Sequence, residues 1–504
     1  MTEHLQKRRS RREGDILVSV IVFAAIAITI TLGLVNWGAA LIREIRTVAT
    51  REQAFQIAEA GIDYYRWHLA QYPTDYQDGT GVPGPYVHDF YDKNGVLLGT
   101  YSLSITPPPV GSTKVIVTST ASTTADPSIV KMVQAVLAKP SLAQYSVVAN
   151  DNLRFGSGTS VYGPVTANGG IRFDGTAYNT ISSAQRTYTD PDTGLTEWGV
   201  WTSETPADPQ PPTAEPSRPD VFTAGRDFPV PASDFTGLTV NLQQLQTTAS
   251  GEGYDFPKSQ YTYTNNRGKL VTTNGYGYLM VLNTDGTFTM YVVTALVSPP
   301  NGCSNYGNQA QWGTWSIKTD VLYKTAANQT GVYALPPSGV VFAEDNLWVQ
   351  GQVNGARLTI AAGILPDPGP SGEPSITINN DLLYTNTDGT DVLGLIAQGN
   401  VNVGLVSANN LTIDGALVSE NGRVGRYYYY PYYCDIGGVD YVDRSSITLD
   451  GMIATDQRYG FAYTDNTGYS ARNIYYDNNL LYGPPPSFPL ASTQYQLISW
   501  RQLQ

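Results

Sequence analysis

An uncharged apolar run near the start of the chain restricts the possible folds more than any other feature. It extends from Ile16 to Val35, and as an α-helix it would span about 30 Å, the thickness of a bilayer core. A helical spacing of apolar residues then continues to Leu69. No signal-peptidase pattern follows the run, so a removable secretory signal is disfavoured. We therefore expect one helix over residues 15–72, half in a membrane and half outside it.

The charges beside this run predict its orientation. Five basic residues precede it: Lys7, Arg8, Arg9, Arg11 and Arg12. Positive side chains favour the cytoplasmic side of a membrane. Residues 1–14 are therefore expected as a basic cytoplasmic leader, and the chain after about residue 43 is expected outside. Arg43 and Arg46 weaken this contrast without reversing it.

Two motifs in this region resemble type IV pilins. Arg11-Arg12-Glu13-Gly14 is similar to a prepilin leader, which would be cut between Gly14 and Asp15. The segment 53–62 (QAFQIAEAGI) is similar to the signature of PilX-type minor pilins, and its matching residues are Ala54, Phe55, Ala58, Glu59, Ala60 and Gly61. The sequence departs from the usual pilin pattern at Asp15, where major pilins carry Phe, and at Ser19, where most carry Glu.

The resemblance implies a structural or assembly role in a type IV pilus, or a role in adhesion. It places the protein in the bacterial cytoplasmic membrane with its main part at the cell surface, and it implies other pilins and the pilus assembly machinery as partners. Glu59 could pair with a basic group of a neighbouring subunit in a filament. The alternative is an ordinary charge on the helix surface.

Composition and turn signals predict a β-rich chain after the helix. The 504 residues include 49 Gly, 32 Pro and 35 Tyr, and only 14% are charged. Pro73 should end the helix. Four short alternating runs follow, and they predict a small antiparallel pilin-like head over residues 73–140 on which the helix buries its apolar stripe. The runs are Tyr86–Tyr91, Val96–Ile105, Lys114–Thr120 and Ile129–Leu137.

A recurring phrase predicts a different architecture after residue 141. Each copy reads as a strand end, a tight Asn/Gly/Asp turn and a new strand, and the copies are 149–155, 167–173, 343–349 and 397–403. Turns at a fixed phase between short strands favour a solenoid over a sandwich. We expect a right-handed parallel β-helix that starts at 141–184 and continues with its closing segment at 339–504. The segments 391–401 and 411–418 also resemble the repetitive ectodomains joined to PilX-type N-termini.

Residues 185–338 are expected as an insertion that forms a side module. Six prolines between Pro206 and Pro219 indicate an extended strap. A short helix is predicted over Asp234–Thr248. A hairpin is predicted from Tyr276–Asn283 and Thr287–Val297, joined at Asp285-Gly286.

Charge and histidine content limit the function classes. The chain has a formal net charge of −13; residues 1–14 carry +3, which leaves −16 on the remainder. An acidic ectodomain disfavours a nucleic acid as partner. The histidines His4, His68 and His88 all precede the solenoid, so histidine bases, histidine metal sites and Ser-His-Asp triads are unavailable within it. We expect no enzyme and no cofactor.

The alternative function is a surface-anchored protein that binds or cleaves carbohydrate. A paired-carboxylate mechanism would draw on Asp435, Asp440 and Asp443, which otherwise form a solvated acidic loop. Asp190, Asp192 and Glu197 are spaced like calcium ligands, but the run lacks the remaining ligands of a calcium loop, so a plain turn is favoured and no metal is expected.

The stretch 427–433 (YYYYPYY) has the most unusual composition in the chain. Tyr427, Tyr428, Tyr429, Tyr430, Tyr432 and Tyr433 could contact surface glycans or proteins of a host or neighbouring cell. They could equally pack down as an inert loop. The chain has two cysteines, Cys303 and Cys434, and Cys434 directly follows the tyrosine stretch. They form either a disulfide or two separate thiols.

Overall fold

The computed structural model describes residues 3–235, 237–303 and 313–503, and it divides into two compact units. The first unit comprises Met1–Pro107, Val115–Leu137 and Leu497–Gln504. The second comprises Pro108–Lys114 and Ala138–Gln496. In chain order, the second unit is therefore an insertion into the first.

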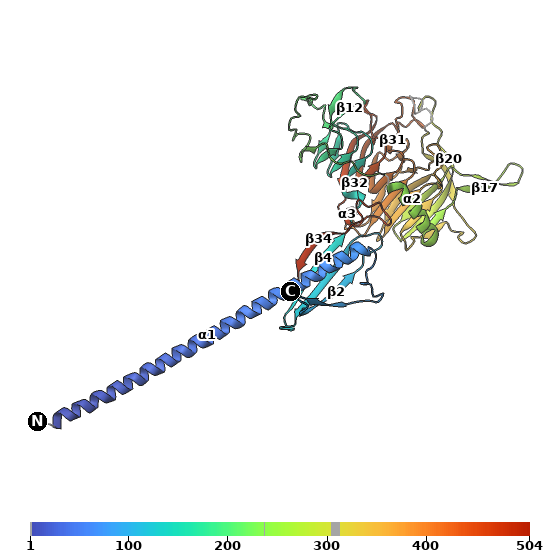
Figure 1. The fold of residues 1–504 in the computed structure, drawn as a ribbon. Helices are drawn as coiled ribbons and strands as arrows, with labels where there is room; N and C mark the ends of the chain where they lie inside the picture. The colour runs from blue at the N-terminus through green and yellow to red at the C-terminus, as the bar shows by residue number, and fades with distance from the viewer. Residues whose placement is uncertain (1–2, 236, 304–312, 504) are drawn as a thin grey trace. The chain divides into compact units, whose positions relative to one another are not determined.

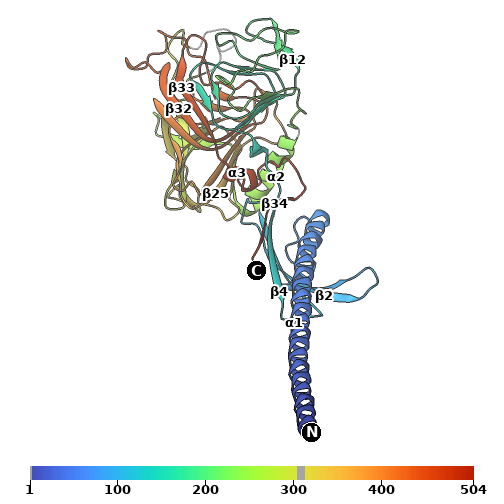
Figure 2. The ribbon, with the colours of Figure 1, turned by 90° about the vertical axis from the view of Figure 1, so that its left-hand side faces the viewer.

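The first unit is organised around one long helix, α1 (Glu3–Gln71), which runs without a break in Figures 1 and 2. The expected helix is confirmed. It is long and apolar enough to cross a membrane: its most apolar 18-residue window has a mean hydropathy of 2.7, and none of that window is buried. Helix α1 ends two residues before Pro73, which cannot continue the hydrogen-bond ladder.

The head of the first unit is an antiparallel sheet in the order β1-β2-β3-β4. The four predicted strands are confirmed, with bounds β1 (Tyr86–Tyr91), β2 (Leu97–Thr106), β3 (Val115–Thr123) and β4 (Val130–Ala138). Strand β3 alternates buried and half-buried positions along its whole length. Its buried face packs against the outer part of α1, as the apolar stripe of the helix requires.

A fifth strand, β34 (Gln496–Gln502), completes this sheet beside β4. Leu503 N donates to Met132 O at 2.8 Å just beyond it. These residues were expected in the closing segment of the solenoid. Alternating residues indicate a strand but do not identify its partner, so the return to the head could not be read from the pattern.

The second unit is mostly β-structure with parallel strands. Its longest ladder pairs neighbours in parallel from one end to the other. In spatial order the strands are β16 (Tyr254–Phe256), β23 (Val340–Ala343), β25 (Arg357–Ala362), β28 (Val392–Ala397), β30 (Asn410–Ser419), β32 (Asp443–Thr455), β5 (Val147–Ala149), β8 (Val165–Ala167), β11 (Ile181–Ser183) and β15 (Arg226–Asp227).

Further parallel ladders run beside this one and share its core. One contains β19 (Tyr278–Asn283), β24 (Leu347–Val353), β26 (Ile376–Thr377), β29 (Val401–Val403) and β31 (Val424–Arg426). Another contains β27 (Leu382–Tyr384), β30, β32, β33 (Gly468–Tyr476), β7 (Thr159–Val161) and β10 (Thr176–Ala177). A third contains β6 (Leu153–Phe155), β9 (Ile171–Phe173) and β14 (Val200–Trp201). Buried side chains from all of them form one hydrophobic cluster.

The strands do not stack in chain order. Strands β5 to β15 follow β32 in space, whereas β16 and β23 lie at the opposite end of the ladder. The insertion also differs from the expected side module, because its strands β16 and β19 pair with β23 and β24 and extend the sheet. Each copy of the turn phrase predicts a strand end, a turn and a new strand. The phrase carries no information on which of these strands pair with each other.

Helix α2 (Gly237–Glu252), labelled in Figure 1, lies between β15 and β16 in the sequence. It agrees with the helix predicted over Asp234–Thr248. Leu242, Leu245 and Ala249 are buried in a second cluster with outward-facing residues of the main ladder. The helix therefore covers an apolar outer face of the sheet that would otherwise contact water.

The remaining elements are short, apart from the hairpin of β19 and β20 (Thr287–Leu296), which is confirmed in antiparallel register. Strands β17 (Gln260–Thr264) and β18 (Leu270–Asn274) form a separate two-stranded sheet, seen projecting in Figure 1. The others are η1 (Leu142–Gln144), β12 (Thr187–Thr189), β13 (Thr196–Trp198), β21 (Ile317–Leu322), β22 (Val332–Ala334) and α3 (Asn479–Tyr482).

Candidate functional site

The pilin-like signature lies where α1 packs on the head sheet. Ala54 and Ala58 are completely buried, and Gly61 is buried beside them. A Cβ atom at Gly61 would overlap Ser119 Oγ and approach Tyr101 Cδ2 at 2.8 Å. The small residues of the signature therefore let the helix approach the sheet closely.

The other signature residues are less buried. Phe55, Glu59 and Ala60 are half-buried. The Phe55 ring meets the Trp500 ring edge-on, with centroids 5.8 Å apart, so the C-terminal strand β34 contacts the signature. Further along α1, His68 bonds Asp75 at 2.9 Å and fixes the end of the helix to the following loop.

The close approach at Gly61 predicts a loss of stability when a side chain is added. Gly61→Ala should lower the free energy of unfolding of the head by about 1–3 kcal/mol, the usual cost of overpacking. The measurement is denaturant unfolding of the full-length protein in detergent. Gly38→Ala is the matched control on the same helix, because no heavy atom lies within 4 Å of a Cβ there. Equal behaviour of the two variants would contradict the packing at Gly61.

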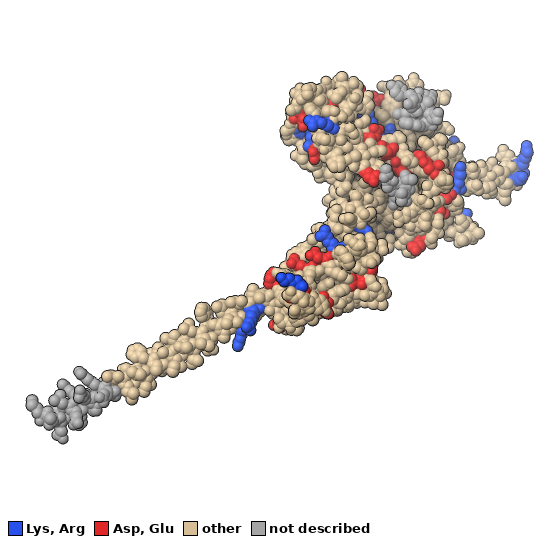
Figure 3. Space-filling model, in the orientation of Figure 1, with Lys and Arg blue, Asp and Glu red and all other residues tan. Residues whose placement is uncertain are grey.

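The inner half of α1 is apolar on all sides and uncovered. Its large apolar residues between Ile16 and Val48 are 43–72% exposed. Figure 3 shows this part of the helix without charged side chains up to the basic residues near the head. A helix that is apolar all round is unstable in water, so this segment requires lipid or other helices around it.

The tyrosine-rich stretch divides into a buried set and an exposed set. Tyr427 and Tyr429 are buried, and Tyr428 is half-buried with its hydroxyl on Asp465 Oδ2 at 2.7 Å. Tyr430, Tyr432 and Tyr433 are exposed, and Tyr432 reaches 92%. Tyr432 also adopts a positive φ of 72°, an uncommon conformation for a bulky residue. The stretch therefore has a side packed on the core and a side that faces solvent.

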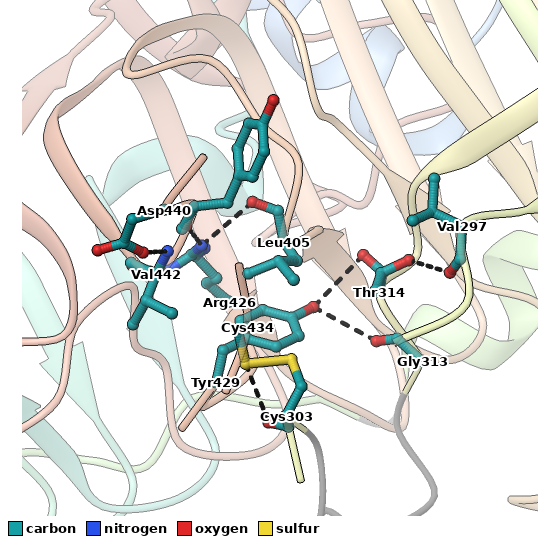
Figure 4. The surroundings of a disulfide bond; sticks show 11 residues. Val297, Cys303, Gly313, Thr314, Leu405, Arg426, Tyr429, Cys434, Asp440 and Val442 are labelled. Carbon is teal, nitrogen blue, oxygen red and sulfur yellow. Dashed lines mark hydrogen bonds between the residues drawn. A yellow bond between two sulfur atoms is a disulfide. The ribbon is translucent and has the colours of Figure 1, made fainter. Parts of the chain in front are cut away.

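A disulfide between Cys303 and Cys434 holds the end of this stretch (Figure 4). The two Cα atoms are 4.7 Å apart. Both cysteines are fully buried in a small cluster with Leu405, Tyr429 and Val442. We name residues 427–434 the aromatic loop. Its base is covalently fixed while its three exposed tyrosines stay accessible.

Arg426 lies under the aromatic loop as a buried cation. Its guanidinium donates to Val442 O at 2.7 Å, Tyr441 O at 2.6 Å and Leu405 O at 3.3 Å, and it lies over the Tyr429 ring at 5.1 Å. Burial lowers the pKa of Arg426. Backbone carbonyls and an aromatic face thus take the place of a carboxylate. Sequence reasoning missed this residue, because an isolated arginine at the end of a strand gives no local signal of burial.

Of the three acidic residues beside the loop, Asp440 stabilises a turn and Asp443 begins strand β32. Asp435 and Asp440 are exposed, and Asp440 Oδ1 accepts from Val442 N at 2.7 Å. Burial, followed by the charge of Asp440, raises the pKa of Asp443. These contacts agree with the solvated acidic loop.

The calcium-like run is also a turn. Asp190 Oδ1 accepts from the backbone N–H of Asp192 and Thr193, Asp192 pairs with Arg154 and Arg458, and Glu197 accepts from Gln210. Within the described ranges, no three His, Cys, Asp or Glu residues are placed to hold a metal ion.

A carboxylate stack was not foreseen. Asp414 of β30 pairs in register with Asp450 of β32. Asp477 directly follows β33, the strand that pairs with β32 on its other side. Burial, and then the charges of Asp477 and Asp414, raise the pKa of Asp450 to about 6. The signal was present in the sequence, since LTIDGALVS and ITLDGMIAT repeat at a spacing of 36 residues, and that spacing is the observed register.

This stack predicts that removing the charge of Asp450 changes the free energy of unfolding by an amount that depends on pH. Because the folded-state pKa of Asp450 is raised, its ionisation destabilises the folded state as the pH increases from 3.8 to above 6. Asp450→Asn should therefore stabilise the second unit by about 1 kcal/mol at pH 8, after allowance for solvent screening. At pH 4 the two proteins should unfold alike. Denaturant midpoints at both pH values test this, and an equal gain at both would refute the electrostatic cause.

Comparisons with known proteins give little beyond this geometry. No protein-family model and no curated protein matches the chain. Among solved structures, the chain is similar to the competence-associated pilin ComZ from Thermus thermophilus, at 12% sequence identity and a TM-score of 0.32, over 90% of this chain and 98% of that one. A superposition at this TM-score does not establish a shared fold.

Proposed function

We propose that this chain is a membrane-anchored, type IV pilin-like surface protein of the PilX type. The observation that carries the proposal is the division of α1. Its outer half buries one stripe on a small antiparallel sheet, whereas its inner half is apolar on all sides and exposed. Such a segment needs an apolar environment. Lipid would supply it before assembly, and neighbouring pilin helices would supply it in a filament.

The sequence motifs add the pilin-specific part of the proposal. The leader ending at Gly14 would be cut by a prepilin peptidase, and Ala54, Ala58 and Gly61 would hold the head on the helix in the manner of PilX-type pilins. Basic residues favour the cytoplasmic side of a membrane, so the proposed orientation has the N-terminus in the cytoplasm and the head sheet and the second unit outside. Other pilins and the assembly machinery are the proposed partners.

We further propose that the parallel ladders wind as a right-handed β-helix. Right-handed crossovers between parallel strands are strongly favoured. The proposed role of this rigid body is structural or adhesive, without a catalytic step and without a nucleic-acid partner. The exposed tyrosines Tyr430, Tyr432 and Tyr433 are its proposed contact surface for proteins of other cells, because rigid aromatic side chains dominate protein interfaces.

Two measurements on the native protein test the proposal. The mass of the mature protein should correspond to a start at Asp15, and Gly14→Ala should retain the leader, whereas Gly33→Ala should be processed normally. The chain should also be present in filaments sheared from cells. A mature protein that keeps residues 1–14 and is absent from sheared filaments would contradict the pilin assignment while leaving the membrane anchor intact.

A further inference from the structure

A groove in the second unit has the chemistry of a saccharide site. Its volume is about 1080 Å³, and all of its lining residues belong to the second unit. Four parts of the chain line it: residues 111–113, residues 142–182 with Gln144, Tyr145 and Thr180, the segment 227–234 and helix α2 with Asp227 and Gln244, and the proline-rich segment 484–493. Ligand sites have volumes of about 300–1,000 Å³, so this groove is large enough for a chain of several units.

The lining mixes apolar and polar groups, is neutral to acidic, and is free of bases. Hydroxyl groups and amides alternate with proline and aromatic carbon, and no lysine or arginine is among the lining residues. Anionic ligands need cationic partners or oriented N–H donors, so phosphates and uronates do not fit. A neutral saccharide fits, because it combines many hydroxyl groups with apolar C–H faces.

Several of the polar groups are available to a ligand. In the described chain, the side chains of Gln144, Thr180 and Gln244 take part in no hydrogen bond. Tyr145 is half-buried and packs on the cluster under α2, so its ring is held in place. Small-molecule binding sites usually combine a fixed aromatic ring with a few polar groups that can bond to the ligand.

An exposed tyrosine stack adjoins the groove in the sequence. Tyr162 and Tyr178 precede the lining residues Pro164 and Thr180 by two positions. The Tyr162 ring stacks on Tyr178 and on Tyr475, each at a centroid distance of 4.5 Å, with interplanar angles of 3° and 9°. All three rings are 39–47% exposed. This tyrosine stack therefore puts exposed aromatic side chains two positions along the chain from the lining of the groove.

From the groove and the stack together, we infer that the second unit binds a neutral oligosaccharide of several sugar units. Sugar hydroxyl groups bond to Gln144, Thr180, Gln244 and Asp227, and C–H faces contact Tyr145. An extended peptide is the competing ligand class. It would need a strand edge, and the described strand that borders the groove at the end of the sheet, β15, has two residues.

Titration calorimetry on the full-length protein in detergent tests the inference. The probes are cellohexaose, chitohexaose, xylohexaose and maltohexaose, with hexagalacturonate as the anionic comparison and a proline-rich decapeptide as the peptide comparison. At least one neutral probe should bind with a Kd below about 1 mM. Gln144→Ala and Gln244→Ala should each weaken it about 2- to 10-fold, the usual range for one hydrogen bond, and Tyr178→Ala should weaken it as well.

Tyr263→Ala is the matched control, since Tyr263 is 45% exposed on the separate β17–β18 hairpin; it should bind like the wild type. Tyr145→Phe keeps the packed ring and should bind within about 3-fold of the wild type, which separates loss of contact from loss of folding. The inference is overturned if no neutral probe binds with a Kd below about 1 mM, if hexagalacturonate or the peptide binds more tightly, or if the glutamine variants bind unchanged. Each of these outcomes leaves the pilin assignment untouched.

Discussion

Replacing Cys303 and Cys434 together by alanine is expected to lower the free energy of unfolding of the second unit by about 3–5 kcal/mol. The bond joins residues 131 positions apart, and in the chain-entropy account a loop longer than 100 residues contributes close to 5 kcal/mol. Loss of two buried sulfur atoms from the cluster around Leu405 and Val442 adds to the effect. Denaturant unfolding of the full-length protein in detergent gives the magnitude.

Two further results separate the cross-link from the packing. Wild-type protein unfolded in the presence of a thiol reductant should match the double variant to within about 1 kcal/mol, because reduction removes the bond and keeps the sulfur atoms. Proteolysis within the aromatic loop, at the exposed Tyr430, Tyr432 and Tyr433, should become faster in both samples. If reduction leaves the unfolding midpoint unchanged, the bond does not stabilise this unit.

The long apolar helix and the head sheet could be predicted because their signals are local. Twenty consecutive apolar residues favour a helix long enough to cross a membrane. The alternating runs from Tyr86 to Leu137, with a turn at Asn94-Gly95, specify neighbouring antiparallel strands because short connections leave little choice of partner. The structure places β1 to β4 within a few residues of the predicted bounds.

The pairing of distant segments could not be predicted in the same way. Strand β34 returns to β4 across more than 350 residues, and β5 follows β32 in the ladder. Each segment shows only that it is a strand, and the choice between equivalent edges depends on packing elsewhere in the fold. The 36-residue repeat around Asp414 and Asp450 is the exception, because its two copies align residue by residue in the sheet.

The aromatic loop illustrates the same limit for the site. Its composition marked it as unusual, but six similar tyrosines gave no basis for separating Tyr427 and Tyr429, which are buried, from Tyr432, which is exposed. That separation follows from Cys434 and Arg426, which fix one side of the loop against the core. Cys303, to which Cys434 is bonded, lies 131 positions away in the sequence.

Arg426→Ala is the second variant with a large expected effect, a loss of about 3–5 kcal/mol in the free energy of unfolding of the second unit. The substitution leaves the carbonyl groups of Leu405, Tyr441 and Val442 without their donor. It also opens a cavity under the Tyr429 ring, where the guanidinium now lies. Unpaired buried acceptors and lost side-chain volume each cost about 1–3 kcal/mol or more.

Two companion variants distinguish these causes from the removal of a charge. Arg426→Met keeps most of the volume but supplies no donor, so it should remain at least about 2 kcal/mol less stable than the wild type. If Arg426 is only an unfavourable buried charge, Arg426→Met should instead be as stable as the wild type or more so. Arg267→Ala, in the exposed turn between β17 and β18, should change stability by less than about 0.5 kcal/mol. We infer that the guanidinium of Arg426 holds the aromatic loop against the sheet by donating to three backbone carbonyls. A methionine variant as stable as the wild type would contradict this.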